Sequence, residues 1–120
     1  MIEDLAYNEV FVFGSNLAGK HGGGAARQAY DRFGAQWGVG EGLTGQSYAF
    51  PTLDKDFKQL PIPKLCSAKD AFYRCVTAHP ELNFLFTKVG CGIAGYPEED
   101  MCMLFQDAPE NVVLPSDWRR

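Results

Sequence analysis

Apolar residues along the chain fall into two kinds of segment, short continuous runs and longer stretches with helical spacing. Four runs rich in β-branched and aromatic residues predict strands, at residues 9–13, 46–52, 82–89 and 111–115. Three stretches with apolar residues every three or four positions predict helices, beginning at residues 22–25, near Leu65 and at Pro97. Because strands alternate with helices, the pattern predicts an α/β domain whose mostly parallel sheet is covered on both faces.

Glycine and aromatic residues mark the ends of these elements. The first helix is expected to bury one face, consisting of Ala26, Ala29, Tyr30 and Phe33. Gly34 is expected to stop this helix, and the glycine-rich stretch 34–45 predicts a loop that folds over part of the molecule. After the last strand, Trp118 is expected to pin the tail 116–120 to the domain.

Two glycine-rich loops each follow an expected strand and precede an expected helix. The first, GSNLAGKHGGG, spans residues 14–24, and the second, GCGIAGYP, spans residues 90–97. Glycine lets a backbone turn tightly and approach a ligand, and the N–H groups at the start of a helix attract anions. Because the carboxyl ends of parallel strands meet at one edge of a sheet, we expect the loops to form two lips of one phosphate-binding cleft.

The composition predicts one soluble domain spanning residues 1–120. Hydrophobic residues make up 46% and charged residues 22% of the chain, and no apolar stretch approaches the length of a membrane span. Residues 1–4 lack the basic start and apolar run of a signal peptide, so we expect a cytoplasmic protein. The formal charge of −4 argues against nonspecific nucleic-acid binding, whereas backbone N–H groups can still hold a small phosphorylated ligand.

The chain has four cysteines and two histidines. The cysteines form no CxxC pair, so we expect reduced thiols and no metal site. Cys75 and Cys102 lie in helical apolar patterns and are expected in the core. Cys91 lies inside the second glycine loop, where it either has a thiol pKa lowered by the following helix or packs beneath the loop.

The order of these motifs resembles the macro domain, a family that binds ADP-ribose. The match consists of a strand, GSN at 14–16, GGGA at 22–25 and a helix, then a second strand, GCGIAGYP at 90–97 and a helix. The chain is also similar to small bacterial and phage-associated macro-like proteins of unassigned function. The resemblance covers most of the chain and implies a three-layer α/β/α sandwich, an ADP-ribose-like nucleotide ligand and no cofactor.

Carried over position by position, the resemblance implies a set of ligand-binding residues in the two loops. This set is Gly14, Ser15, Asn16, Gly22, Gly23, Gly24, Gly90, Cys91, Gly92, Ile93, Ala94, Gly95 and Tyr96. Asn16 takes the place of the asparagine that contacts the distal ribose, residues 22–24 lie beside that ribose and the diphosphate, and residues 92–95 wrap the phosphates. Ala94 stands where the family usually has an aromatic residue, so stacking on the distal ribose is either absent or supplied by Tyr96.

Asn16 and His21 are the candidate catalytic side chains. Asn16 can donate and accept hydrogen bonds toward ribose hydroxyls, or bond the backbone of its own turn. His21 could carry a proton or hold a phosphate, or lie on the surface at a helix start. If the chain is an enzyme, the expected reaction is hydrolytic removal of ADP-ribose, or of a group attached to it, by a bound water.

Three other functions stay open on the sequence alone. One is a noncatalytic reader or scavenger of an NAD-derived nucleotide, which the lack of a carboxylate after Ile93 favours. Another is a different nucleotide-binding sandwich, in which a Gly-Gly-Gly turn serves nucleotide-monophosphate hydrolysis with a carboxylate close to Gly22. The third is an assembly protein whose loops are only turns. Trp37, Tyr48 and Phe50 either stack on a base or belong to the core, and the oligomeric state is open.

Overall fold

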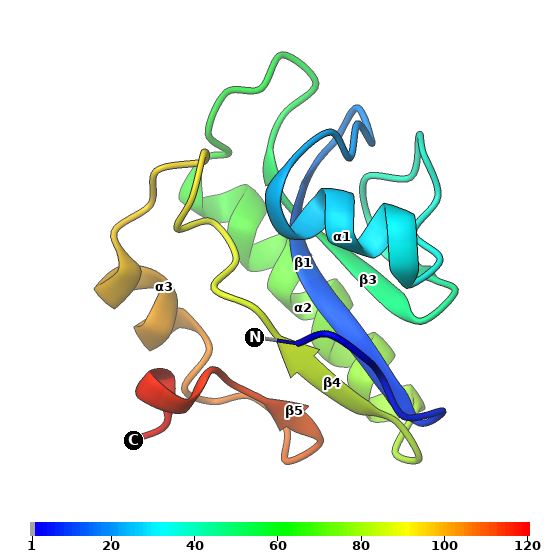
Figure 1. Cartoon of the computed structure of the whole chain (residues 1–120). Helices are drawn as coiled ribbons and strands as arrows, with labels where there is room; N and C mark the ends of the chain where they lie inside the picture. Colours follow the sequence, from blue (N-terminus) through cyan, green and yellow to red (C-terminus); the bar gives the residue numbers. More distant parts are fainter. Residues whose placement is uncertain (1) are drawn as a thin grey trace.

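The central strand of the sheet is β1 (Glu9–Asn16), which pairs in parallel with β3 (Ser47–Leu53) on one side and with β4 (Asn83–Phe86) on the other. A computed structural model describes residues 2–120; Met1, part of the N-terminal sequence considered above, lies outside the described residues. The edge strand β5 (Val112–Val113) runs parallel to β4, and β2 (Gly42–Thr44) runs antiparallel to β3. The order β2-β3-β1-β4-β5 confirms a mostly parallel sheet in an α/β domain (Figure 1).

Three helices connect the strands. They are α1 (Gly24–Arg32), α2 (Ile62–Ala78) and α3 (Glu98–Leu104), and a short 3-10 helix follows at Ser116–Trp118. Figure 1 shows α1 and α2 on opposite sides of β1. Across residues 2–120, no helix combines the length and the apolar character needed to cross a bilayer.

Side chains of β1 alternate between two hydrophobic clusters, as a strand buried on both faces requires. Val10 and Val12 belong to the larger cluster, which includes residues from α2, α3 and the C-terminal segment. Phe11 and Phe13 belong to the smaller cluster with residues of α1 and its flanks. The sheet therefore separates two packed regions, and both hold β1 in place.

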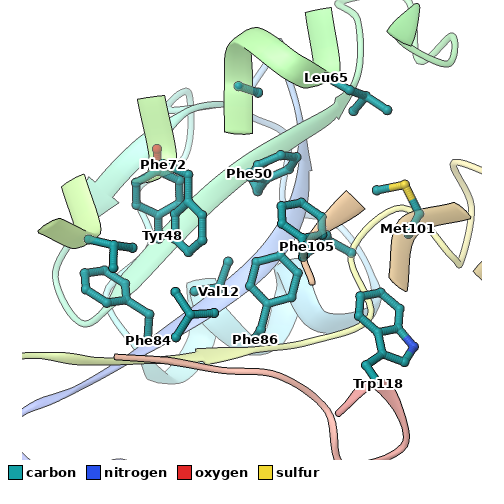
Figure 2. Close-up of a cluster of buried hydrophobic side chains, with 14 of the residues drawn as sticks. Val12, Tyr48, Phe50, Leu65, Phe72, Phe84, Phe86, Met101, Phe105 and Trp118 are labelled. Atoms are coloured by element: carbon teal, nitrogen blue, oxygen red, sulfur yellow. The ribbon is translucent and has the colours of Figure 1, made fainter. Parts of the chain in front are cut away.

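Aromatic side chains dominate the larger cluster, which Figure 2 shows in close-up. The ring of Phe86 lies 4.5 Å from that of Phe105 and 6.3 Å from that of Trp118, measured between centroids. Trp118 is 1% exposed, which confirms that it pins the tail. Tyr48 and Phe50 are also buried in this cluster. Of the two interpretations of these residues, base stacking and core packing, the structure confirms core packing.

Several predicted boundaries differ from the structure. β1 does not end at Gly14 but continues to Asn16, because β3 extends alongside it and pairs as far as Leu53. β4 stops at Phe86; the amide of Thr87 still donates to the carbonyl of Val12, and its hydroxyl donates to the same carbonyl. The predicted strand at residues 82–89 is therefore three residues too long at its carboxyl end.

Two further predictions were wrong, one for a side chain of α1 and one for the segment 34–45. Tyr30 is 42% exposed although it was expected on the buried face of α1. Its ring instead packs edge-on against Trp37, with 5.5 Å between the centroids. The segment expected as an unbroken loop contains β2, whose three residues pair with the start of β3 and reverse the chain through Gly45 and Gln46.

Candidate functional site

Both glycine-rich loops open onto one cavity of about 740 Å³ at the carboxyl ends of β1 and β4. The parallel pairing of Val10 with Phe84 and of Val12 with Phe86 aligns the two strands, so their following loops meet at the same edge. Gly14 and Gly90 both line the cavity. The prediction that these two positions lie at one edge of the sheet is confirmed.

The two glycines at this edge allow the strand ends to approach closely. A β-carbon on Gly14 would lie 3.3 Å from the amide nitrogen of Gly90, tighter than ordinary van der Waals contact. Gly90 has a φ of +79°, and a β-carbon there would lie 3.0 Å from both Met101 and Tyr96. Gly90 is therefore required both by its backbone conformation and by its packing.

The side chain of Asn16 holds the start of the first loop together. Its Nδ2 donates to the carbonyl of Lys20 at 2.8 Å, and its Oδ1 accepts from the amide of Lys20 at 3.0 Å. Asn16 lines the cavity and is 8% exposed. A primary amide offers two donors and two acceptor sites, so one of each stays available to a ligand.

His21, a residue of the first loop, is fully buried, which excludes the alternative of a surface histidine. Its Nε2 lies 2.9 Å from the carbonyl oxygen of Gln36, and its ring packs edge-on against Phe13 and Trp37. The Nδ1 atom is buried and has no hydrogen-bond partner in the part of the chain that the structure describes. His21 is not among the cavity-lining residues, so the structure does not bring this candidate proton carrier to the site.

The first loop is also fixed by close backbone packing against the segment 38–40. The amide of Gly38 donates to the carbonyl of Gly19 at 2.8 Å, and the hydroxyl of Ser15 donates to the carbonyl of Gly40 at 2.5 Å. A β-carbon on Gly19 or on Gly40 would overlap backbone atoms of the facing segment. These contacts make the loop a rigid wall of the cavity.

The glycine triplet at residues 22–24 has a different character, because it faces open space. A β-carbon on any of these three glycines would meet no atom within 4 Å, and all three line the cavity. Gly23 is the N-cap of α1, which has no side-chain cap and no acidic residue in its first turn. The amides of Gly24, Ala25 and Ala26 make no hydrogen bond within residues 2–120. The start of α1 therefore presents unpaired N–H donors beside the cavity.

The second loop presents a similar row of backbone donors. The amides of Gly95 and Tyr96 close the loop by donating to Gly92 and Gly90. Those of Gly92, Ile93 and Ala94 make no hydrogen bond among the described residues, and the three residues line the cavity. Successive free N–H groups of this kind form a concave surface that suits an anion.

Charged side chains distinguish the two lips of the cavity. The first turn of α3, which follows the second loop, carries Glu98, Glu99 and Asp100. Lys88 lines the cavity on this side and is bound at 2.8 Å by Glu98 and at 2.7 Å by Asp117. Hydrogen bonds from these two carboxylates raise the pKa of Lys88 above its usual value, so the ammonium form is favoured. Its positive charge is already compensated.

In the second loop, the predicted site and the structure differ at three residues. Cys91, Gly95 and Tyr96 do not line the cavity. Tyr96 is 7% exposed, and its hydroxyl donates to the carbonyl of Leu60 at 2.5 Å, so its ring supports the loop from the core side. Burial raises the pKa of the Cys91 thiol instead of lowering it, and the thiol lies 3.6 Å from the carbonyl of Val89. The interpretation that Cys91 packs beneath the loop is confirmed. Gly95 has a φ of +75° and forms the turn itself.

Several cavity residues were not singled out by the sequence. Thr52 and Thr87 follow from strand pairing, because they lie at the ends of β3 and β4. Lys20 lies within the first loop. Phe57 belongs to a polar surface connection and carries no motif. Trp37, by contrast, is a residue that the sequence assigns either to base stacking or to the core; it is 52% exposed and lines the cavity, so it does not belong to the core.

All four cysteines are free thiols, as expected. Residues 2–120 contain no group of three or more His, Cys, Asp or Glu side chains arranged to hold a metal ion. Searches of protein-family models, of curated proteins and of solved structures find no match to this chain.

Proposed function

We propose that this protein binds a nucleotide diphosphate of the ADP-ribose type in the cavity between its two glycine-rich loops. The observation that carries the proposal is the pair of free backbone N–H rows, at 24–26 and 92–94, that line one cavity. Backbone donors of this kind bind phosphate without adding net charge, which agrees with a chain whose formal charge is −4.

The size and lining of the cavity support a small organic ligand. Pockets for such ligands typically measure about 300–1,000 Å³ and combine apolar walls with a few polar groups. This cavity, at about 740 Å³, combines Ala, Val, Ile and aromatic side chains with the amide of Asn16 and the hydroxyls of Ser15, Thr52 and Thr87. The amide of Asn16 keeps a free donor and a free acceptor for ribose hydroxyls. The three hydroxyls donate to backbone carbonyls and can still accept a hydrogen bond from the ligand.

The electrostatics favour the first loop as the stronger phosphate-binding lip. The start of α1 carries a positive partial charge and no acidic side chain, and Lys20 nearby has no carboxylate partner within ion-pair distance among the described residues. At the second lip, Glu98 and its acidic neighbours reduce the attraction for an anion. The diphosphate is therefore proposed to lie against residues 22–26, with the second loop closing over it.

The fold is compatible with the macro-like arrangement that the motifs resemble. The proposal includes a three-layer organisation in which α1 forms one outer layer and α2 with α3 forms the other. The two hydrophobic clusters on opposite faces of β1 support it. Asn16 at the end of β1 and the triplet at 22–24 would then contact the distal ribose and the diphosphate.

A pair of substitutions at Gly23 tests the proposal. Gly23 has φ −156° and ψ 166°, an extended conformation that any residue adopts, and faces open space. Aspartate and asparagine are both good N-cap residues, so Gly23→Asp and Gly23→Asn should leave the thermal midpoint unchanged or slightly raised. Only aspartate places a negative charge where the phosphates are proposed to bind.

Calorimetric titration with ADP-ribose should therefore separate the two variants. We expect wild type to bind, Gly23→Asn to bind more weakly because its side chain occupies a helix donor, and Gly23→Asp to lose at least a further tenfold in affinity. Equal affinities for the Asp and Asn variants, with both folded, would contradict a phosphate site at the start of α1. Failure of the wild type to bind ADP-ribose, ADP or pyrophosphate would contradict the proposed function as a whole.

A further inference from the structure

Phe57, one of the residues that line the cavity, has an unusual backbone conformation. It is the one non-glycine residue among residues 2–120 with a positive φ, at +62°. This region is disfavoured for bulky side chains, and glycine is the residue that normally occupies it. The side chain of Phe57 is 48% exposed and lines the cavity. A large apolar ring is therefore held toward the cavity at a position where glycine would suit the backbone better.

A tight turn after β3 imposes this conformation. The carboxylate of Asp54 accepts from the amides of Asp56 at 2.8 Å and Lys58 at 3.0 Å, and the amide of Asp54 donates to the carbonyl of Lys58. The amide of Phe57 donates to the carbonyl of Asp54 at 3.1 Å. These bonds fix residues 54–58 without any contribution from the Phe57 ring. The ring is thus not needed to form the turn that presents it.

Lys20 connects this turn to the first glycine loop. Its ammonium nitrogen lies 5.7 Å from the centroid of the Phe57 ring, within the range of a cation–π contact. Lys20 also lines the cavity, and Asn16 bonds both backbone groups of Lys20. The first loop and the turn at 54–58 therefore meet at the wall of the cavity, with the Lys20 ammonium over one face of the half-exposed Phe57 ring.

We infer that Phe57 recognises the nucleobase by stacking its ring on the base, while the ammonium group of Lys20 binds the neighbouring phosphates. This inference rests on the proposed function. It adds that Phe57 makes the protein prefer a diphosphate that carries a base to a diphosphate without one. An exposed aromatic face is tolerant of ring identity, because every base has a π-face. Specificity for a base-carrying ligand follows, without discrimination among the bases.

The test compares ADP, which carries a base, with inorganic pyrophosphate, which does not. Phe57→Gly removes the ring and replaces it with the residue that the backbone conformation prefers, so the thermal midpoint should stay the same or rise. Its affinity for ADP should fall by about five- to 150-fold, the range expected for loss of one base–aromatic stack. Its affinity for pyrophosphate should stay unchanged.

Three further variants and one control sharpen this comparison. Phe57→Trp keeps an aromatic face and should retain the preference for ADP, whereas Phe57→Leu keeps apolar bulk and should lose it. Lys20→Met should weaken both ligands, because the charge acts on phosphate. Tyr7→Ala is the matched control, since Tyr7 is 94% exposed, precedes β1 at the opposite end of the strand and does not line the cavity.

The outcomes separate this inference from the proposed function. If wild type binds both ligands and Phe57→Gly loses ADP alone, the inference stands. If wild type binds but Phe57→Gly leaves ADP affinity unchanged, or weakens ADP and pyrophosphate equally, the inference fails and the proposed function survives. If wild type binds neither ADP nor pyrophosphate, the inference fails; if it also fails to bind ADP-ribose, the proposed function is overturned as well.

Discussion

Replacing Asn16 by alanine should reduce both the stability of the protein and its affinity for ADP-ribose. The substitution removes two hydrogen bonds to Lys20, at 2.8 Å and 3.0 Å, and leaves an amide and a carbonyl in a part-buried loop without partners. Each such bond contributes a net ~0.5–1.5 kcal/mol, so the expected loss is about 1–3 kcal/mol. For a domain of this size, that corresponds to a fall in thermal midpoint of roughly 4–12 °C.

Asn111 provides the matched control. Its amide nitrogen lies 3.0–3.2 Å from the carbonyls of Val76, His79 and Leu82, so it braces backbone in the same way, and it does not line the cavity. Asn111→Ala should be destabilising to a similar degree and should leave ligand affinity unchanged. Both variants are assayed by thermal unfolding and by titration with ADP-ribose and AMP at a temperature where each is folded.

Under the proposed function, Asn16→Ala should weaken ADP-ribose binding by about one to two orders of magnitude and AMP binding little, because AMP lacks the distal ribose. A loss of stability without any change in ADP-ribose affinity would show that Asn16 only braces its own loop. An equal loss for both ligands would point to a displaced loop, not to a missing ribose contact.

Two further predictions concern stability. Gly40→Ala should lower the thermal midpoint by several degrees, because a β-carbon there overlaps backbone atoms of the facing loop. Gly22→Ala should leave the midpoint unchanged, because a β-carbon there meets no atom within 4 Å. Equal midpoints for the two variants would contradict the description of the first loop as a rigid wall. Hydrogen bonds from Lys88 hold the pKa values of Glu98 and Asp117 below the ordinary values of these carboxyl groups. The two ion pairs therefore stabilise the folded state fully at a pH above the ordinary pKa values, and this stabilisation is lost as the pH falls through the lowered pKa values. Thermal melts between about pH 6 and pH 3 should therefore show a steeper acid loss for wild type than for Lys88→Met, and parallel curves would refute the role of this cluster.

The sequence predicted the sheet and the position of the cavity because both follow from local patterns, the apolar strand runs and the glycine loops after them. The regular geometry of a parallel sheet then brings these distant segments together. Two strands followed by glycine loops define one sheet edge once the strands are parallel neighbours. The pairing of Val10 with Phe84 and the shared cavity bear out this reasoning. Trp118 was also predicted correctly, since a large apolar ring in a polar tail has few stable places outside the core.

The side-chain details could not be predicted in the same way, because they depend on which loop packs against which. His21 is buried by the segment 36–37, which is distant in sequence and has no pattern that pairs it with the first loop. Tyr96 points into the core because the carbonyl of Leu60 accepts from its hydroxyl. Phe57 reaches the cavity only through the conformation of its turn, and no local motif announces a positive φ for phenylalanine.

The shape of the sheet's margins bears on how this protein behaves at high concentration. Exposed strand edges can recruit strands from other chains, and long flat edges are the most prone to aggregate. Here the outermost strands have only three and two residues. The part of β3 beyond its pairing with β2 is covered by residues 58–60, through the bridge of Leu53 with Gln59 and the bond from the Leu60 amide to Thr52. Neither margin offers a long template for intermolecular β-structure, so we expect the folded domain, despite its aromatic-rich core, to form few fibrils through its sheet edges.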